Sequence, residues 1–165
     1  LFYNPHRKAE NPLYNDDCIY TPDVTVFKTD TSVAEKLAET DWYQVDVLTC
    51  AAPNLRRKPS NSMNPHAGKT AATIRNSDLY DLLVKRITRI FQVAIANGTE
   101  ILVLGAFGCG AFCNPPMIVA RAFRNVQEKY DGYFDTIEYA VFCKKNETEN
   151  YDAFCREFPK TRFKS

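Results

Sequence analysis

The chain has 165 residues and carries 21 Lys and Arg against 20 Asp and Glu, which gives a formal net charge of +1. This balance excludes the strongly basic surface that sequence-specific nucleic acid binding requires, and a hydrophobic fraction of 45% excludes disorder over most of the length. A chain of this size is expected to fold as a single domain, residues 1–165, and no apolar run approaches the roughly 20 residues that span a bilayer, so no membrane partner is expected.

The first part of the chain contains few regular elements. Residues 1–16 are polar and are expected to form an irregular lead-in. Two extended pieces, 18–20 and 24–27, are separated by Pro22, which cannot donate a hydrogen bond to a neighbouring strand. The sequence of residues 32–40 is consistent with a short helix.

A buried strand is predicted for residues 45–52, where a mostly apolar run ends at Pro53 and Asn54. The long loop that follows, residues 55–69, is rich in Asn, Pro and Ser, and loops of this length in compact domains are usually functional or mobile. Its basic run, Arg56-Arg57-Lys58, is interpreted as a solvated loop.

The clearest helix follows, because apolar residues repeat at steps of four and three: Leu79, Leu83, Ile87, Ile90 and Ala94. Ser77 is the predicted N-cap, and Asn97-Gly98 gives the stop signal. An apolar strand at 101–104 leads into a glycine-rich turn.

A second helix is then predicted with Asn114 as its N-cap, followed by a strand at 136–143 and a closing helix at 151–158. Alternation of strands and helices predicts an α/β fold with parallel pairing.

The turn at 105–114 has the features of an anion site. Glycines at 105, 108 and 110 permit unusual backbone conformations and close approach of a ligand, and main-chain N–H groups before a helix start can converge on phosphate oxygens. The turn has no Lys and is therefore not a Walker loop, and its glycine spacing does not fit the dinucleotide fingerprint. A plain tight turn between strand and helix would explain the glycines equally well.

Three motifs together resemble the microbial-type poly(ADP-ribose) glycohydrolases. They are the glycine-rich stretch 105–115 with 119–123 behind it, the stretch 19–27, and the stretch 45–54. Their order and spacing agree with that family over residues 14–158, which favours the anion site over the plain turn.

The resemblance implies a macrodomain-like, three-layer α/β/α fold with a central mixed, largely parallel sheet and ADP-ribose across the carboxyl ends of its strands. It implies contacts to the ligand's diphosphate and ribose from Gly105, Ala106, Phe107, Gly108, Cys109, Gly110, Ala111, Phe112 and Asn114. In particular, Gly108, Cys109, Gly110 and Ala111 would offer main-chain amides, and Phe112 would pack against the distal ribose. Pro53 and Asn54 are candidates for a pocket wall, and Phe142, near Lys144, for an adenine wall, although an aromatic residue there is more often core.

The chain departs from the family in one respect. The family places a Gly-Gly-Gly segment and a Gln-Glu-Glu segment upstream of the matched part, and the acid there protonates the leaving ribose oxygen. This chain has only six glycines, none adjacent, and its one Gln-Glu pair, Gln127-Glu128, lies within the second predicted helix. Since the chain begins at Leu1 and its first methionine is Met63, we interpret it as truncated on the amino-terminal side.

Two functions follow. The chain is the ADP-ribose-binding part of a protein that hydrolyses the ribose–ribose bonds of poly(ADP-ribose), free or protein-linked, or it is a reader that binds ADP-ribose without cleaving it. An unrelated nucleotide-binding α/β domain is a third, more distant hypothesis. A truncated domain would expose strand edges and is expected to be prone to self-association.

The cysteines and histidines carry weaker candidates. Six scattered cysteines fit neither a disulfide scaffold nor paired zinc ligands, so we expect reduced thiols, no metal, no cofactor and a cytoplasmic protein. Cys109 lies at a turn where a thiolate could be stabilised, but His6 and His66 lie in polar loops, which disfavours a Cys–His hydrolase. Asn64-Pro65-His66 is interpreted as a plain turn.

Overall fold

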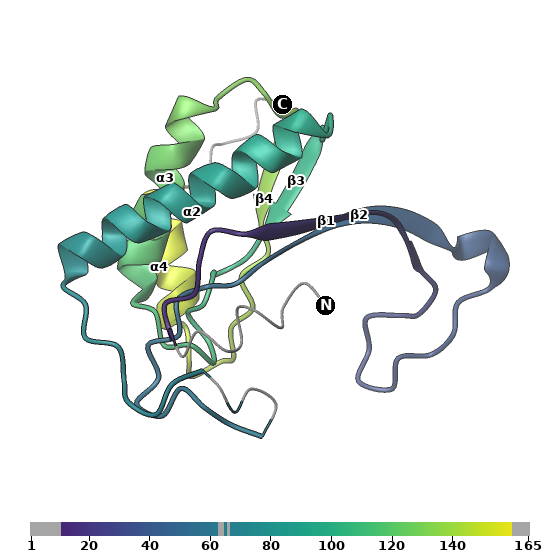
Figure 1. Ribbon diagram of the computed structural model, residues 1–165. Helices are drawn as coiled ribbons and strands as arrows, with labels where there is room; N and C mark the ends of the chain where they lie inside the picture. The colour runs from purple at the N-terminus through teal and green to yellow at the C-terminus, as the bar shows by residue number, and fades with distance from the viewer. Residues whose placement is uncertain (1–10, 63–64, 66, 160–165) are drawn as a thin grey trace.

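The structure is a computed structural model, and it describes residues 11–62, 65 and 67–159 (Figure 1). The protein is of the α/β class, as predicted. In chain order the elements are β1 (Cys18–Val26), the 3-10 helix η1 (Glu39–Asp41), β2 (Tyr43–Cys50), α2 (Asn76–Ala96), β3 (Ile101–Leu104), α3 (Pro116–Lys129), β4 (Thr136–Tyr139) and α4 (Glu149–Glu157).

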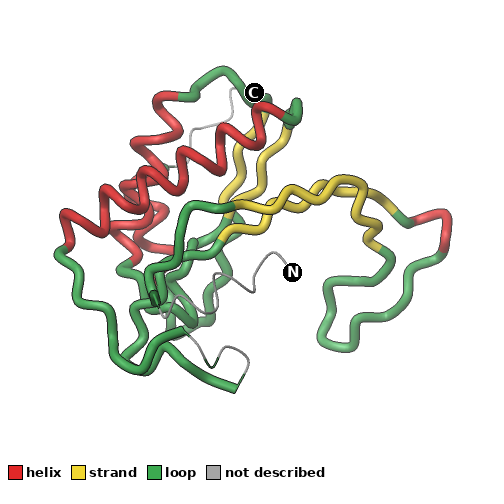
Figure 2. Tube along the Cα trace, in the orientation of Figure 1, coloured by secondary structure: helices red, strands yellow, loops and turns green. Residues whose placement is uncertain are grey.

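Strands β1 and β2 form an antiparallel hairpin whose tip reaches away from the helices (Figure 2). The two pieces predicted on either side of Pro22 are one strand with a bulge, in which Pro22 and Asp23 together oppose a single residue, Asp46. The Asp46 carboxylate stabilises the bulge, because it accepts hydrogen bonds from the Tyr20 hydroxyl and, at 3.0 Å, from the Asp23 amide. Asp23 has a positive φ of 56°, a conformation that Asp tolerates better than most residues.

The helix predicted for residues 32–40 is wrong. Within this stretch the structure contains one turn of 3-10 helix at its end, η1. Lys36 instead forms an antiparallel bridge with Lys28, so the chain returns alongside the extension of β1. Pairing with the hairpin therefore overrides the local helical preference.

Helix α2 confirms the predicted apolar stripe, since all five of its residues are buried. The predicted cap is wrong, because Arg75 precedes the first turn and Ser77 lies inside the helix. The Ser77 hydroxyl donates to Asp78 at 3.2 Å, and the Arg75 guanidinium pairs with the same carboxylate at 2.8 Å. In the described part of the chain, no helix is long and apolar enough to cross a membrane.

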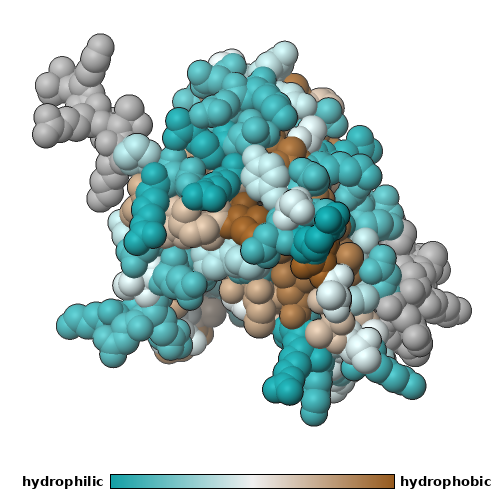
Figure 3. Space-filling view, turned by 90° about the vertical axis from the view of Figure 1, so that its left-hand side faces the viewer, coloured by the Kyte–Doolittle hydropathy of each residue, from teal (hydrophilic) through white to brown (hydrophobic). Residues whose placement is uncertain are grey.

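The core lies between the helices and one face of the β3–β4 sheet. Leu102 belongs to the same hydrophobic cluster as the buried faces of α2, α3 and α4. On the opposite face of β3, the side chains of Ile101 and Val103 are 63% and 61% exposed. Hydrophobic residues are also visible at the surface of the face that Figure 3 shows, where they gather in a central patch framed by hydrophilic side chains.

The sheet arrangement differs from the expected single central sheet. Strands β3 and β4 pair in parallel, as predicted, but the described residues form two separate two-stranded sheets, β1–β2 and β3–β4. The predicted strands were also longer than the observed ones at their carboxyl ends, since β2 ends at Cys50 and β4 at Tyr139. Both strands end where the chain turns into the loops that build the site.

Candidate functional site

The loop between β3 and α3 is shaped by a turn at Gly108. The Cys109 amide donates to the Ala106 carbonyl at 3.0 Å, and Gly108 has a φ of +73°. This is the third position of a four-residue turn, where a positive φ favours glycine. Of the three glycines in the loop, Gly108 alone requires this conformation.

Gly108 is also tightly packed. A Cβ atom at this position would lie 2.4 Å from Asn114 Nδ2 and 2.6 Å from the Ala52 Cβ, distances that real Cβ atoms do not show. By contrast, a Cβ at Gly110 would meet nothing within 4 Å. The loop therefore closes around Gly108 and leaves open space at Gly110.

Asn114 ties this loop to the segment that follows β2. Its backbone N–H donates to the Gly108 carbonyl at 3.0 Å, and its side-chain Nδ2 donates to the Gly108 carbonyl at 3.1 Å and to the Pro53 carbonyl at 2.7 Å. The predicted role of Asn114 as a helix cap is wrong, since α3 begins at Pro116 and Pro115 precedes it. The side chain is 1% exposed, and its Oδ1 has no donor among the described residues.

Most main-chain amides of the loop donate no hydrogen bond to a described residue, and we call these the unspent amides. The amides of Cys109, Cys113 and Asn114 donate within the loop, whereas those of residues 106–108 and 110–112 donate to no acceptor among the described residues. Of the four predicted amide donors, the Cys109 amide is thus already used in the turn. The remaining N–H groups can bind an anion without breaking a bond that the fold has made.

Phe112 packs against residues that the sequence did not point to. The Arg56 guanidinium lies 5.4 Å from the centre of the Phe112 ring, and the Tyr14 ring lies 6.1 Å from it. The Leu55 amide also donates to the Phe112 carbonyl at 2.9 Å. The solvated loop expected for the basic run is therefore wrong for Arg56, although Arg57 and Lys58 are exposed.

Pro53 and Asn54 are buried beneath the loops. Asn54 is 0% exposed, its Nδ2 donates to the Pro59 carbonyl at 3.3 Å, and its Oδ1 accepts from Arg56 Nε at 3.1 Å. Asn54 thus braces the turn at 54–59, and the role of Pro53 and Asn54 as a pocket wall stays a prediction.

A cavity of about 1020 Å³ lies beside the loop. Its lining brings Cys109 and Gly110 together with Phe142, which follows β4. The Phe142 side chain is 81% exposed, so the interpretation of this residue as core is wrong. An exposed aromatic ring beside unspent amides offers a stacking surface next to an anion site.

The Cys109 thiol is not an activated nucleophile. Burial, and to a smaller extent the charge of Glu149, raises the pKa of Cys109 to about 12. The thiolate is the reactive form, so Cys109 remains a thiol at neutral pH. His6, Asn64 and His66 lie outside the described residues, and within the described residues no group of three metal-ligating side chains comes together.

A buried arginine that the sequence analysis did not identify connects segments of the chain that lead into the site. Arg86, 1% exposed, donates to Asp16 at 3.2 Å, to the Leu13 carbonyl at 3.0 Å and to the Ala51 carbonyl at 2.8 Å. It thereby joins the lead-in to the end of β2. Burial would raise the pKa of Asp16, but hydrogen bonds from Lys85 and Arg86 outweigh burial and lower it.

No family model and no curated protein sequence matches the chain. Solved structures do. Poly(ADP-ribose) glycohydrolase from Deinococcus radiodurans, in complex with ADP-ribose, is 30% identical with a TM-score of 0.77, over 95% of this chain and 58% of that one. The enzyme from Thermomonospora curvata, bound to the inhibitor ADP-HPD, is 32% identical with a TM-score of 0.78, over 95% and 54%.

The chain is therefore an α/β domain that is similar, over nearly its whole length, to the microbial poly(ADP-ribose) glycohydrolases. The resemblance carried by the three motifs is confirmed by this similarity. The chain spans a little more than half the length of these proteins.

Proposed function

We propose that this chain binds ADP-ribose, with the diphosphate held by the main-chain amides of the loop between β3 and α3. The observation that carries the proposal is the set of unspent amides at 106–108 and 110–112, beside a cavity and on a loop held rigid by Gly108 and Asn114. The D. radiodurans relative, which shares the fold, was crystallised with ADP-ribose.

The chemistry of the site suits this ligand. The cavity lining includes Lys144 and Arg156 but also Glu147, Glu149 and Asp152, so side-chain charge does not favour an anion. Backbone N–H groups carry no net charge and bind phosphate oxygens by hydrogen bonding, so they can hold the diphosphate in a cavity whose side chains are not predominantly positive. Phe142 is exposed at the same cavity and is proposed to stack on the adenine.

For the complete protein we propose hydrolysis of the O-glycosidic ribose–ribose bonds of poly(ADP-ribose), free or protein-linked. That reaction requires a positioned carboxylic acid, and the sequence of this chain contains neither Gly-Gly-Gly nor Gln-Glu-Glu. The same observation favours the second candidate function, a reader that binds ADP-ribose without cleaving it.

We also propose the three-layer arrangement with one central sheet for the complete domain. The bare face of β3, with Ile101 and Val103 exposed, supports a further layer on that side. A cytoplasmic location remains a prediction from the sequence.

Calorimetry with ADP-ribose on the 165-residue chain tests the binding proposal. We expect saturable binding, and weaker binding by the Gly110→Val variant, because the valine side chain would occupy the open space beside the neighbouring amides. Gly110 does not have a positive φ, so the substitution is expected to act through the space that it fills and not through backbone strain. The matched control is Ala38→Val at the exposed far end of the hairpin, which should bind like the wild type.

A release assay on poly(ADP-ribose) separates the two candidate functions. Binding without release of ADP-ribose supports the reader for this chain, whereas release shows that it is itself an enzyme. Competition by AMP or NAD as strong as that by ADP-ribose would favour an unrelated nucleotide-binding domain. Absence of ADP-ribose binding by the folded chain would refute the site.

A further inference from the structure

Two cysteines face each other across the β1–β2 hairpin. Cys18 is the first residue of β1 and Cys50 is the last residue of β2, and the antiparallel register places them directly opposite one another. Side chains at directly opposite positions project from the same face of a sheet. Both thiols are free and half-buried, and Cys18 is close enough to Cys50 to perturb its ionisation. Among the described residues, no other two cysteines occupy paired strand positions.

The spacing of this pair suits a disulfide bond. Directly opposite residues of an antiparallel pair have their Cα atoms roughly 4.5 or 5.5 Å apart. Disulfides join Cα atoms that are about 4.4–6.8 Å apart, so either spacing lies within their range. The bond between Cys18 and Cys50 therefore needs rotation of the two side chains and no rearrangement of the hairpin.

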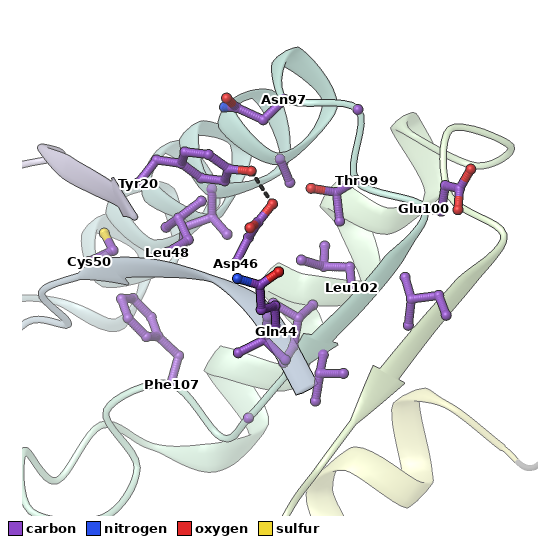
Figure 4. A pocket seen from close by; sticks show the side chains of 18 of the residues that line it. Tyr20, Gln44, Asp46, Leu48, Cys50, Asn97, Thr99, Glu100, Leu102 and Phe107 are labelled. Carbon is purple, nitrogen blue, oxygen red and sulfur yellow. Dashed lines mark hydrogen bonds between the residues drawn. The ribbon is translucent and has the colours of Figure 1, made fainter. Parts of the chain in front are cut away.

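A small reagent can reach the pair. Cys50 lines a cavity of about 1160 Å³ that lies between the hairpin and β3, and Figure 4 shows its side chain there, near Tyr20 and Leu48. Cys18, at the start of β1, is half-buried and not enclosed. Neither thiol is therefore shut inside the core.

We propose that Cys18 and Cys50 are a site of reversible oxidation, at which a low-molecular-weight disulfide such as oxidised glutathione converts the two thiols into one disulfide bond. This bond locks the end of β2 to the start of β1. The oxidation does not require ADP-ribose, so its test is independent of the proposed function.

The reaction begins at Cys18. Burial, with a further contribution from the neighbouring Cys18 thiol, raises the pKa of Cys50 to about 12. Because the thiolate is the reactive form, Cys50 does not attack first. The Cys18 thiolate attacks one sulfur of the small disulfide, whose S–S bond breaks as the bond to Cys18 forms. One small thiolate leaves with the electron pair and takes up a proton.

Cys50 completes the exchange. Once Cys18 is part of the mixed disulfide, its thiol no longer raises the pKa of Cys50, whereas the charge of Arg86 continues to lower it. Cys50 gives its proton to water, its sulfur attacks the Cys18 sulfur, and the second small thiolate leaves and is protonated. The two protein thiols are thus oxidised by two electrons, and one small disulfide is reduced to two small thiols.

The disulfide would act on the segment that leads into the candidate site. From Cys50 the chain continues to Pro53, whose carbonyl accepts a hydrogen bond from Asn114 Nδ2 at 2.7 Å. Just before β1 the chain is held at Asp16, which pairs with the buried Arg86 at 3.2 Å. The new bond would join these two segments covalently, and closing a loop in this way stabilises the folded state by restricting the unfolded chain.

Peptide mapping tests the oxidation. The 165-residue chain is incubated with oxidised glutathione at about 1 mM, free thiols are blocked with N-ethylmaleimide, and a tryptic digest is analysed by mass spectrometry without reduction. Trypsin separates the two cysteines into the peptides 9–28 and 37–56. We expect these two peptides to be linked, and excess dithiothreitol to release them. If Cys18 and Cys50 carry only glutathione adducts, or remain thiols, the proposal is overturned.

A matched variant tests the register. Cys50→Ser combined with Thr49→Cys moves the thiol by one residue, to the opposite face of the hairpin. The link to Cys18 should then fall by at least about tenfold, because side chains on opposite faces cannot meet the geometry of a disulfide. A link as abundant as in the wild type would show that the thiols pair without the register of the hairpin, which contradicts the assignment.

Thermal unfolding and amide hydrogen exchange test the lock. The linked protein should have a Tm roughly 5–10 °C above that of the reduced protein. The amides of Asn54 and Leu55, which hold the segment after β2 by hydrogen bonds of 2.7 and 2.9 Å, should exchange more slowly. Cys18→Ser treated with the same oxidant should show neither change. A linked protein with an unchanged or lower Tm, or with unchanged exchange at these two amides, overturns the lock and with it the proposal.

Discussion

Replacement of Gly108 by alanine tests whether the loop between β3 and α3 is as rigid as its packing indicates. The residue has a φ of +73°, and a left-handed conformation costs an alanine about 1–2 kcal/mol. Its Cβ would also lie 2.4 Å from Asn114 Nδ2 and 2.6 Å from the Ala52 Cβ. Relief of such overpacking typically costs about 1–3 kcal/mol more.

We therefore expect Gly108→Ala to lower the free energy of unfolding by about 2–5 kcal/mol and the Tm by roughly 10 °C. Denaturant titration and thermal unfolding measure both quantities. Gly110→Ala is the matched control, since its Cβ meets nothing within 4 Å, and it should stay within about 0.5 kcal/mol of the wild type.

A double-mutant cycle identifies the cause. If the contact with Asn114 is responsible, Gly108→Ala combined with Asn114→Ala should cost at least about 1 kcal/mol less than the sum of the two single changes. A loss below about 1 kcal/mol for Gly108→Ala alone, or strict additivity in the cycle, would refute the reasoning.

Three further predictions concern other parts of the site. Asp16→Asn should lower the free energy of unfolding at pH 7 by about 1–3 kcal/mol, because it leaves the buried Arg86 without its carboxylate. The folded state lowers the pKa of Asp16, so the stability that its carboxylate contributes is complete above about pH 4 and is lost as the pH falls through the folded-state pKa. Denaturation measured between pH 7 and pH 2 should show this loss of stability in the wild type and not in the variant. Phe142→Ala should weaken ADP-ribose binding by about tenfold in calorimetry without changing the Tm, because the ring is exposed. Cys109, with a pKa of about 12, should react with iodoacetamide at pH 8 more slowly than the exposed Cys113, and faster labelling of Cys109 in mass spectrometry would contradict its burial.

The sequence predicted correctly those elements whose pattern of apolar residues agrees with the way they pack in the fold. The stripe on α2 and the apolar run of β3 have the periodicity of their elements, and both are found where expected. The helix at 32–40 failed because pairing with the β1 extension is not visible in the residues themselves. The separation of the two sheets was also not predictable, since strand order depends on segments far apart in the chain.

The residues of the site were likewise predicted in part only. The glycine spacing located the loop, but it could not distinguish Gly108, which must be glycine, from Gly110, which is open. Asn114 stood at the expected place before a helix and serves instead to join two loops. Arg86 gave one signal that could have been used, a cation among the buried positions of an otherwise apolar helix face, but its three partners come from distant segments.

The bulge in β1 has a consequence for the behaviour of the protein at high concentration. In the described residues the outer edge of β1 has no partner strand, and an unpaired edge is a template for a strand of another copy. Head-to-tail addition of that kind does not close on itself and produces fibres. Pro22 offers no N–H, and the bend at Asp23 interrupts the straight row of backbone groups. Pro22 and the bend at Asp23 therefore act against addition of strands at this edge, and we expect a straightened β1 to favour filament formation.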